Sequence, residues 1–455
     1  MSTDVKKMVR GELTAFLSLV FLLLLSLVGA VLESASIQVM KNERRADAGR
    51  AMESVFAEYQ REFLEEYEIF AIDGSYETEV FSESNILNRL SYYGAENIDM
   101  EISEVRYLTD EDGKAFYEQA VQYEKEKTGM DALTDVLEEV GIWKDHAYDY
   151  GKCESEDYET RTKLNQLLQE SEQKLPDEEN PIEAVSNLKS KSMWELVLPE
   201  EFQMSEKVIS KDQVVSNREL QEGNWSEMED TSGGTIFFNL YLMEHFGNAL
   251  NQKENTVLSY ELEYLLSGKS SDKANLESTL TKICSFRFGV NYLYLLSDSE
   301  KQAEARAMAA TLCTLLTVPG ITEVTAQAIL LAWAYGEAVM DVKTLVSGGK
   351  VKLLKDKSNW NLSLEKLASW DSTTEIQKSE NDKDGLDYKT YLQIMLYMKE
   401  KTMLRMRALD LIELNLEQNL PFLQVDQCVT GLKVESTCRL RRGINYQFVT
   451  KYHYQ

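Results

Sequence analysis

The chain has few of the residues from which catalytic and metal sites are usually built. Only three histidines occur in 455 residues. They are His146, His245 and His453, and none has a plausible ligand partner at helical spacing. No HExxH, GxSxG, SxxK or complete phosphate-binding loop is present. We therefore expect no enzymatic activity, no metal ion and no cofactor.

Cysteine is also scarce, with five residues and no CxxC pair. This spacing argues against a zinc site, a thioredoxin-like motif and a disulfide-dense scaffold. Cys428 and Cys438 lie on one extended segment, where ten residues span about 33 Å. A disulfide needs Cα atoms within about 7 Å, so these two pair only if Thr430-Gly431 forms a tight turn.

Basic residues are outnumbered, 48 against 77 acidic ones, which gives a net charge of −29. An acidic chain of this kind repels nucleic acid and anionic lipid head groups, so we expect no nucleic-acid partner. Apolar residues make up 43% of the chain and only five prolines occur. This composition predicts a folded core and not a disordered chain.

One long uncharged run, residues 13–32, is present near the N-terminus. Fourteen of its twenty residues are Leu, Val or Phe. Twenty helical residues span the roughly 30 Å hydrocarbon core of a bilayer. Insertion of the run is favourable by about 4–8 kcal/mol. The sequence therefore predicts a transmembrane helix in contact with membrane lipid.

The alternative is a cleaved signal sequence, for which Ser34 and Ser36 offer an imperfect cleavage site. Signal cores run about 7–15 residues, so a retained anchor is the better interpretation. Three basic residues precede the run, and a long soluble segment translocates largely regardless of its charge. We expect a single-pass protein of the cell membrane with a cytoplasmic tail (residues 1–12) and its bulk outside the cytoplasm.

An apolar stripe follows the predicted span. Its members recur at spacings of three and four residues, which indicates one helix face: Met52, Phe56, Tyr59, Phe63, Tyr67 and Phe70. We expect the membrane helix to continue as a stalk helix over residues 33–72. The stripe then packs against partner helices or against its own domain.

The remaining sequence predicts a mainly helical α+β fold. Alternating apolar residues predict a strand within 98–107 and a C-terminal hairpin over 432–454 that joins the same sheet. Helices are expected over the ranges 112–140, 152–174, 299–317, 321–346 and 388–419. The predicted division is a small α+β subdomain, residues 73–175 and 425–455, and a helical subdomain, residues 176–424.

The most unusual polar residues lie in apolar helical surroundings: Glu261, Glu263, Arg287, Asn291 and Glu337. Arg287 and Asn291 are one helical turn apart and need buried partners, for which Glu261 or Glu263 are candidates. A structural salt-bridge network is the preferred interpretation. The alternative is a cell-envelope hydrolase that uses these desolvated carboxylates as acid and base.

Several segments resemble a known family: YELEYLLSGKSSDKANL (260–276), LAWAYGEAVMDVKTLVSGGKV (331–351), DYKTYLQIMLYM (387–398), NPIEAVSNLKSKSMWELVLP (180–199) and the N-terminal GELTAFLSLVFLLLLSLVGAVLESA. The chain resembles a domain-of-unknown-function family of Gram-positive single-pass membrane proteins. Its members tend to be encoded beside Tad/Flp pilus genes and have N-termini like the TadE and TadG pseudopilins.

The resemblance implies a pilus-assembly or minor-pilin role, and it implies no activity and no site residues. One departure is that the fifth residue after Gly11 is Phe16, whereas prepilin processing favours Glu there, so an uncleaved anchor is expected. Our leading hypothesis is a membrane-anchored, non-enzymatic protein that works with pilus or surface-assembly proteins. A sensor that signals through the span is the weakest alternative, because the N-terminal tail carries no output domain.

Overall fold

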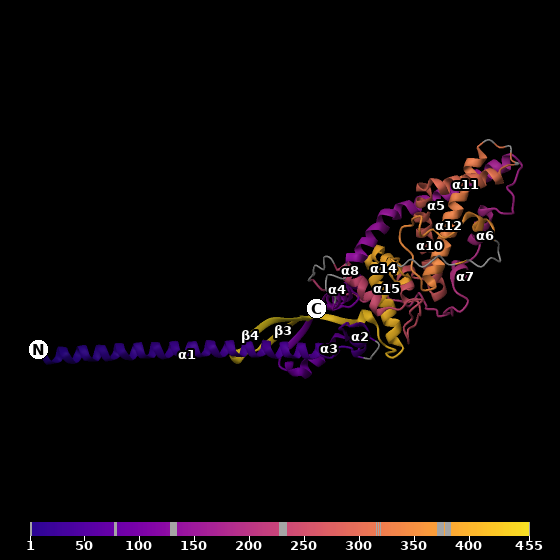
Figure 1. Cartoon of the computed structure of the whole chain (residues 1–455). Coiled ribbons are helices and arrows are strands. Elements are labelled where there is room, and N and C mark those ends of the chain that lie inside the picture. The colour runs from indigo at the N-terminus through magenta and orange to yellow at the C-terminus, as the bar shows by residue number, and fades with distance from the viewer. Residues whose placement is uncertain are drawn as a thin grey trace. The chain divides into compact units, whose positions relative to one another are not determined.

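The computed structural model describes residues 2–454, with gaps at 77–79, 128–133, 227–233, 315, 317, 319, 371–376 and 378–383. The chain forms two compact units. Unit 1 comprises Met1–Glu111, Leu220–Glu229 and Leu420–Gln455, and unit 2 comprises Asp112–Glu219 and Asp230–Asn419. The predicted fold class is confirmed: the protein is mainly helical and has one small antiparallel sheet (Figure 1).

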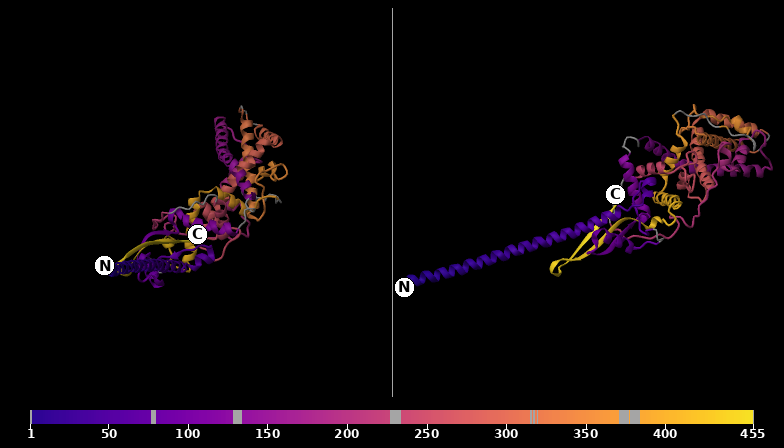
Figure 2. Two further views of the ribbon diagram at one scale, coloured as in Figure 1. Left: turned by 90° about the vertical axis from the view of Figure 1, so that its left-hand side faces the viewer. Right: turned by 90° about the horizontal axis from the view of Figure 1, so that it is seen from below.

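Unit 1 begins with α1, a single helix from Ser2 to Phe56. Its apolar part is long enough to cross a membrane, and none of that window is buried. The helix is therefore compatible with a single-pass anchor, and a signal sequence near the N-terminus passes the same test of length and composition. Contact with the rest of unit 1 begins just past the apolar run, where Ile37 and Met40 pack against the core (Figures 1 and 2).

The sheet of unit 1 contains β1 (Ile72–Asp73), β2 (Asp99–Tyr107), β3 (Cys428–Arg439) and β4 (Asn445–His453). β3 is central and pairs antiparallel with the other three strands. The predicted C-terminal hairpin is confirmed as β3–β4. The strand predicted within residues 98–107 is confirmed as β2. Because β3 runs unbroken, Cys428 and Cys438 lie at opposite ends of it, and both are free.

The aromatic stripe does not follow one helix. α1 ends at Phe56, and Phe63 lies on a separate helix, α2 (Arg61–Tyr67). Phe56 instead packs against the C-terminal strand region, with its ring centroid 4.5 Å from that of Tyr452 and 5.0 Å from that of Tyr454. The long stalk to residue 72 is therefore wrong, because burial of Phe56 in its own unit outweighs continuation of the helix.

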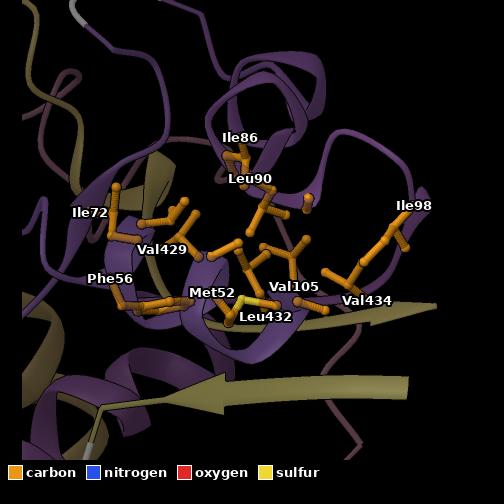
Figure 3. Close-up of a cluster of buried hydrophobic side chains, with 14 of the residues drawn as sticks. Met52, Phe56, Ile72, Ile86, Leu90, Ile98, Val105, Val429, Leu432 and Val434 are labelled. Carbon is orange, nitrogen blue, oxygen red and sulfur yellow. The ribbon is translucent and has the colours of Figure 1, made fainter. Parts of the chain in front are cut away.

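The core of unit 1 is built from α1, the sheet and two further elements, α3 (Glu83–Leu90) and the short π-helix η1 (Ser91–Ala95). Figure 3 shows Met52 and Phe56 of α1 pointing into this core beside Leu432 and Val429 of β3. Short 3₁₀ turns, η3 (Val425–Gln427) and η4 (Arg441–Gly443), flank β3.

Unit 2 is helical. Its elements are α4 (Asp110–Lys127), α5 (Thr134–Glu170), α6 (Pro181–Lys189), α7 (Met193–Val197), α8 (Thr235–His245), α9 (Glu261–Ser267), α10 (Asp272–Ser297), α11 (Ser299–Leu312), α12 (Ile321–Val346), α13 (Leu364–Ala368), α14 (Tyr388–Met398) and α15 (Lys401–Glu417). α12 is buried along most of its length and packs on α10, α11 and α5. α12 has the predicted bounds. The side chains of Ser271 and Asp298 cap α10 and α11, as serine and aspartate commonly do.

Two expectations for unit 2 require correction. The predicted helix over 388–419 is two helices, because Lys399 and Glu400 adopt extended backbone between α14 and α15. No proline or glycine marks this break. It lets α14 pack on α5 and α8 while α15 packs on α9. In addition, α4 and α5 fall in unit 2, although their residues were assigned to the small subdomain.

Candidate functional site

All five polar residues singled out by sequence are buried in unit 2, at no more than 1% exposure. They form two separate groups. Arg287, Asn291 and Glu337 belong to one, which we call the ion cluster and which also contains Asp341 and Lys355. Glu261 and Glu263 form the other, the carboxyl pair. The expected pairing of Arg287 with Glu261 or Glu263 is wrong, because Arg287 binds Asp341.

The first half of the ion cluster joins α10 to α12. The Nε and Nη2 atoms of Arg287 lie 3.0 and 2.9 Å from Oδ2 of Asp341. Nη2 also donates to Oδ1 of Asn291 at 3.0 Å, and Nη1 donates to the carbonyl oxygens of Lys352 and Leu353. Asn291 donates from Nδ2 to the same Asp341 oxygen at 3.1 Å. The guanidinium therefore holds the segment after α12 against α10.

The second half of the cluster centres on Lys355. Its Nζ lies 2.8 Å from Oε1 of Glu337, 2.8 Å from Oδ1 of Asp341 and 2.9 Å from the carbonyl oxygen of Asn359. Glu337 also accepts hydrogen bonds from the backbone N–H groups of Asn361 and Leu362. Every charged group thus has several partners, as burial of charge requires.

The ion cluster is electrically balanced, with two cations and two carboxylates. Burial alone disfavours the charged form of Asp341, but Lys355 and Arg287 hold its pKa below the usual value. Burial likewise lowers the pKa of Lys355, and Asp341 and Glu337 outweigh that effect and raise it. Asp341, Lys355 and Arg287 are therefore stabilised as ions, whereas burial raises the pKa of Glu337 above its usual value despite the contact with Lys355. The cluster connects α10, α12 and the loop over residues 352–362.

The carboxyl pair lies at the start of α9 and is held mainly by backbone groups. Oε2 of Glu261 accepts a hydrogen bond from Gly247 N at 2.7 Å, and its Oε1 accepts one from Asn415 Nδ2 at 2.8 Å. Oε1 of Glu263 accepts from Ala249 N at 3.0 Å and from the Tyr388 hydroxyl at 2.7 Å. These bonds fix the loop after α8 to α9, α14 and α15.

No cation is ion-paired with either carboxyl among the described residues. Burial therefore raises the pKa of Glu261 to about 7 and that of Glu263 to about 7. Oε2 of Glu263 has no hydrogen-bond partner within the described part of the chain. A proton on that oxygen removes the cost of a buried charge.

Sequence reasoning missed four partners: Asp341, Lys355, Tyr388 and Asn415. Asp341 carried a usable signal, because it lies four residues after Glu337 in an apolar helix and therefore shares a face with it. Lys355 lies in a loop and Asn415 on α15, and no local pattern distinguishes them from exposed polar residues.

A cavity of about 480 Å³ lies in unit 2 beside the loop that the carboxyl pair holds, since Gly247 and Asn248 line it. Side chains of both charge signs line it, including Glu124, Glu244, Lys253 and Lys389, together with the apolar Met243. Glu261, Glu263 and Glu337 do not line it. The predicted carboxylates are thus embedded in protein and not arranged around this open space. No group of three or more His, Cys, Asp and Glu residues in the described ranges is arranged to hold a metal ion.

Comparison with known proteins gives one family. A family model described as a family of unknown function (DUF5702) matches residues 171–440, more than half of the chain. The matched region spans the ion cluster, the carboxyl pair and all of β3. No curated protein and no solved structure gives a significant match.

Proposed function

The chain belongs to the DUF5702 family of unknown function, and we propose that it is a membrane-anchored structural or assembly protein whose bulk lies outside the cytoplasm. The observation that carries this proposal is α1. One helix contains both the exposed apolar run over residues 13–32 and the buried face that includes Met52 and Phe56. An anchor built in this way is rigidly continuous with the unit that it holds.

The exposed apolar run supports insertion in a bilayer. All of its large side chains except Val20 are more than half exposed, as at Leu22 (65%) and Leu25 (60%). Exposed apolar patches of this size are costly in water and mark contact with lipid or another protein. The flanking basic residues before the run favour a cytoplasmic N-terminus.

The partner that we propose is a pilus of the Tad/Flp type or a similar surface assembly of a Gram-positive cell. Support comes from the resemblance of the N-terminal segment to TadE and TadG pseudopilins and of the other segments to a family linked to pilus genes. The role is that of an accessory or pseudopilin-like component that binds membrane lipid through residues 13–32. Crosslinking in intact cells followed by mass spectrometry should recover pilus or surface-assembly proteins, and recovery of none of them contradicts this role.

The alternative, a cell-envelope hydrolase, has less support. Glu261, Glu263 and Glu337 are at most 1% exposed and hydrogen-bonded to backbone groups that they hold in place. An acid or base must reach the proton that it transfers. The geometry therefore favours a structural role for these carboxyl groups.

The anchor is tested by charge insertion. We expect L22R/L25R to move the full-length protein from the membrane pellet to the alkaline-carbonate supernatant. Each change from leucine to arginine at a span centre costs about 3–4 kcal/mol, so the two together cost about 6–8 kcal/mol and offset the favourable insertion energy of about 4–8 kcal/mol. The matched control is V39R, a 57%-exposed position of α1 beyond the run, and it should stay in the pellet. A wild-type protein that is soluble and begins after Ser34 or Ser36 would show a cleaved signal instead.

A further inference from the structure

The turn between β3 and β4 is basic in a strongly acidic protein. Arg439, Arg441 and Arg442 are all exposed, against a net charge of −29 for the whole chain. Arg439 and Arg441 have no ion-pair partner among the described residues. We call the segment 439–444 the basic turn.

The basic turn lies next to the end of the apolar run. Arg442 Nη1 forms an ion pair with Oε1 of Glu33, which directly follows Leu32. The contact is supported by apolar packing, since Ile37 and Met40 of α1 and Leu440 of the hairpin belong to one core cluster. In the two views, the hairpin runs beside α1 with its turn toward the apolar end of that helix (Figures 1 and 2).

The turn exposes its three arginines and Ile444, whereas Leu440 faces the core. Arg442 and Gly443 both adopt left-handed conformations, with φ of 60° and 73°. Leu440 N donates to the carbonyl oxygen of Ile444 at 2.8 Å and closes the turn. Leu440 points into the core at 7% exposure, whereas Ile444 is 37% exposed. An exposed isoleucine two residues after Arg442 matches an interface with a polar layer above an apolar one.

The helix geometry sets the depth of the turn in a bilayer. If residues 13–32 fill the hydrocarbon core, Glu33 lies within about 3 Å of its boundary, at about 1.5 Å per residue. The head-group layer is about 5–8 Å thick on each side. The ion pair with Glu33 therefore places Arg442, and with it the basic turn, inside this layer.

A second set of basic residues lies farther along α1. Lys41 and Arg45 stack over the ring of Tyr446, at 4.9 and 5.5 Å from its centroid. Lys41 is nine residues past Leu32, or about 13 Å from the hydrocarbon boundary. This distance is within a Debye length, about 8 Å, of the head-group surface. The acidic neighbour Asp47 is already paired with Arg44 and Arg50, whereas Glu43 is exposed on the same stretch.

We propose that the basic turn is a second membrane contact, in which Arg439, Arg441 and Arg442 bind the phosphate groups of anionic phospholipids while Ile444 enters the boundary of the acyl layer. This rests on the proposed anchoring of α1. The expectation that the acidic chain repels anionic head groups then holds for the whole molecule but not for this turn. Two contacts, helix and turn, fix the orientation of unit 1 on the bilayer, which a single helix leaves free to rotate.

The test uses the full-length chain in nanodiscs and a tryptophan placed in the turn, I444W. Lipids brominated near the head group quench tryptophan fluorescence by contact. The native tryptophan signal is measured on the parent chain and subtracted. We expect at least twofold stronger quenching of I444W in discs containing phosphatidylglycerol than in discs of phosphatidylcholine alone.

The charge dependence is tested by adding R439E/R441E, which leaves the Arg442–Glu33 ion pair intact. Each basic residue near an anionic surface contributes about a fivefold factor, so loss of the two positive charges lowers the ratio of docked to free turn about 30-fold, and the two added negative charges lower it further. The matched variant R439K/R441K keeps the charge and should keep the quenching. Circular dichroism verifies that each variant folds.

The outcomes separate the two proposals. A chain that does not copurify with the discs contradicts the anchor. The chain could copurify with the discs and yet show I444W quenching that is weak and equal in both lipids. That result contradicts the basic turn as a lipid contact and is consistent with the proposed anchor. Quenching that survives R439E/R441E unchanged overturns the electrostatic part of the inference.

Discussion

Lys355 offers the sharpest test of the ion cluster. Replacing it with methionine, K355M, removes one cation and leaves Arg287 facing two buried carboxylates. Glu337 and Asp341 each lose a contact of 2.8 Å, and the Asn359 carbonyl loses one of 2.9 Å. Breaking a buried pair by removing one partner costs about 3–5 kcal/mol, because an uncompensated charge remains.

The assay is urea unfolding of the full chain in detergent, followed by tryptophan fluorescence. Five of the six tryptophans lie in unit 2, so the signal reports that unit. With a slope of about 3 kcal/mol/M, a loss of 3 kcal/mol lowers the urea midpoint by about 1 M. The matched control is K357M, whose ion pair with Glu300 is 75% exposed on both sides. It should change stability by less than about 1 kcal/mol.

A second substitution tests whether the unbalanced charge causes the stability loss in K355M. E337Q/K355M restores charge balance, so at pH 8 it should be more stable than K355M by about 1–2 kcal/mol. In K355M alone, Glu337 has a folded pKa raised by burial, so the variant loses stability as the pH rises from about 5. Near pH 5 the double variant and K355M should therefore converge. If K355M costs less than 1 kcal/mol, or the double variant is no better at pH 8, the reasoning is refuted.

Two further predictions concern the carboxyl pair and the core of unit 1. Because burial raises the pKa of Glu261 and of Glu263 to about 7, each group stabilises the fold below its unfolded pKa, and this contribution is lost as the pH rises toward 7. The loss is up to about 3 kcal/mol per group. The urea midpoint of the wild type should therefore fall between pH 5 and pH 8, and that of E261Q/E263Q should fall much less. An equal change of the midpoint with pH in both proteins would contradict the assignment. F56D places a charge at a 1%-exposed position and should cost at least about 3–5 kcal/mol, seen as protease sensitivity of unit 1. V39D on the same helix, where the side chain is 57% exposed, should leave unit 1 resistant, and resistance of F56D would show that α1 does not pack as described.

Much of the fold was predictable from local pattern. The apolar run over residues 13–32, the bounds of α12 and the β3–β4 hairpin each depend on periodicity within one segment, which the sequence displays directly. The caps at Ser271 and Asp298 follow from the hydrogen-bonding habits of serine and aspartate. Burial of Arg287, Asn291 and Glu337 followed from polar residues set within apolar helices.

Partner choice was not predictable from such patterns. Arg287 binds Asp341, 54 positions away, and Glu337 binds Lys355 in a loop. Glu261 and Glu263 are close in sequence to Arg287 but lie in another part of unit 2. Backbone N–H groups donate hydrogen bonds to their carboxyl oxygens there. The break at Lys399 and the end of α1 at Phe56 likewise depend on which neighbours each helix meets, and neither position carries a proline or glycine.

Local patterns in the chain are sufficient to predict an apolar segment able to cross a membrane, a mainly helical body and a C-terminal hairpin, because these are short-range properties. The position of the hairpin is visible in the folded chain alone, where Arg442 lies beside Glu33 at the end of that segment although the two are more than 400 residues apart. Long-range contacts bring these charges together, and no local pattern encodes them.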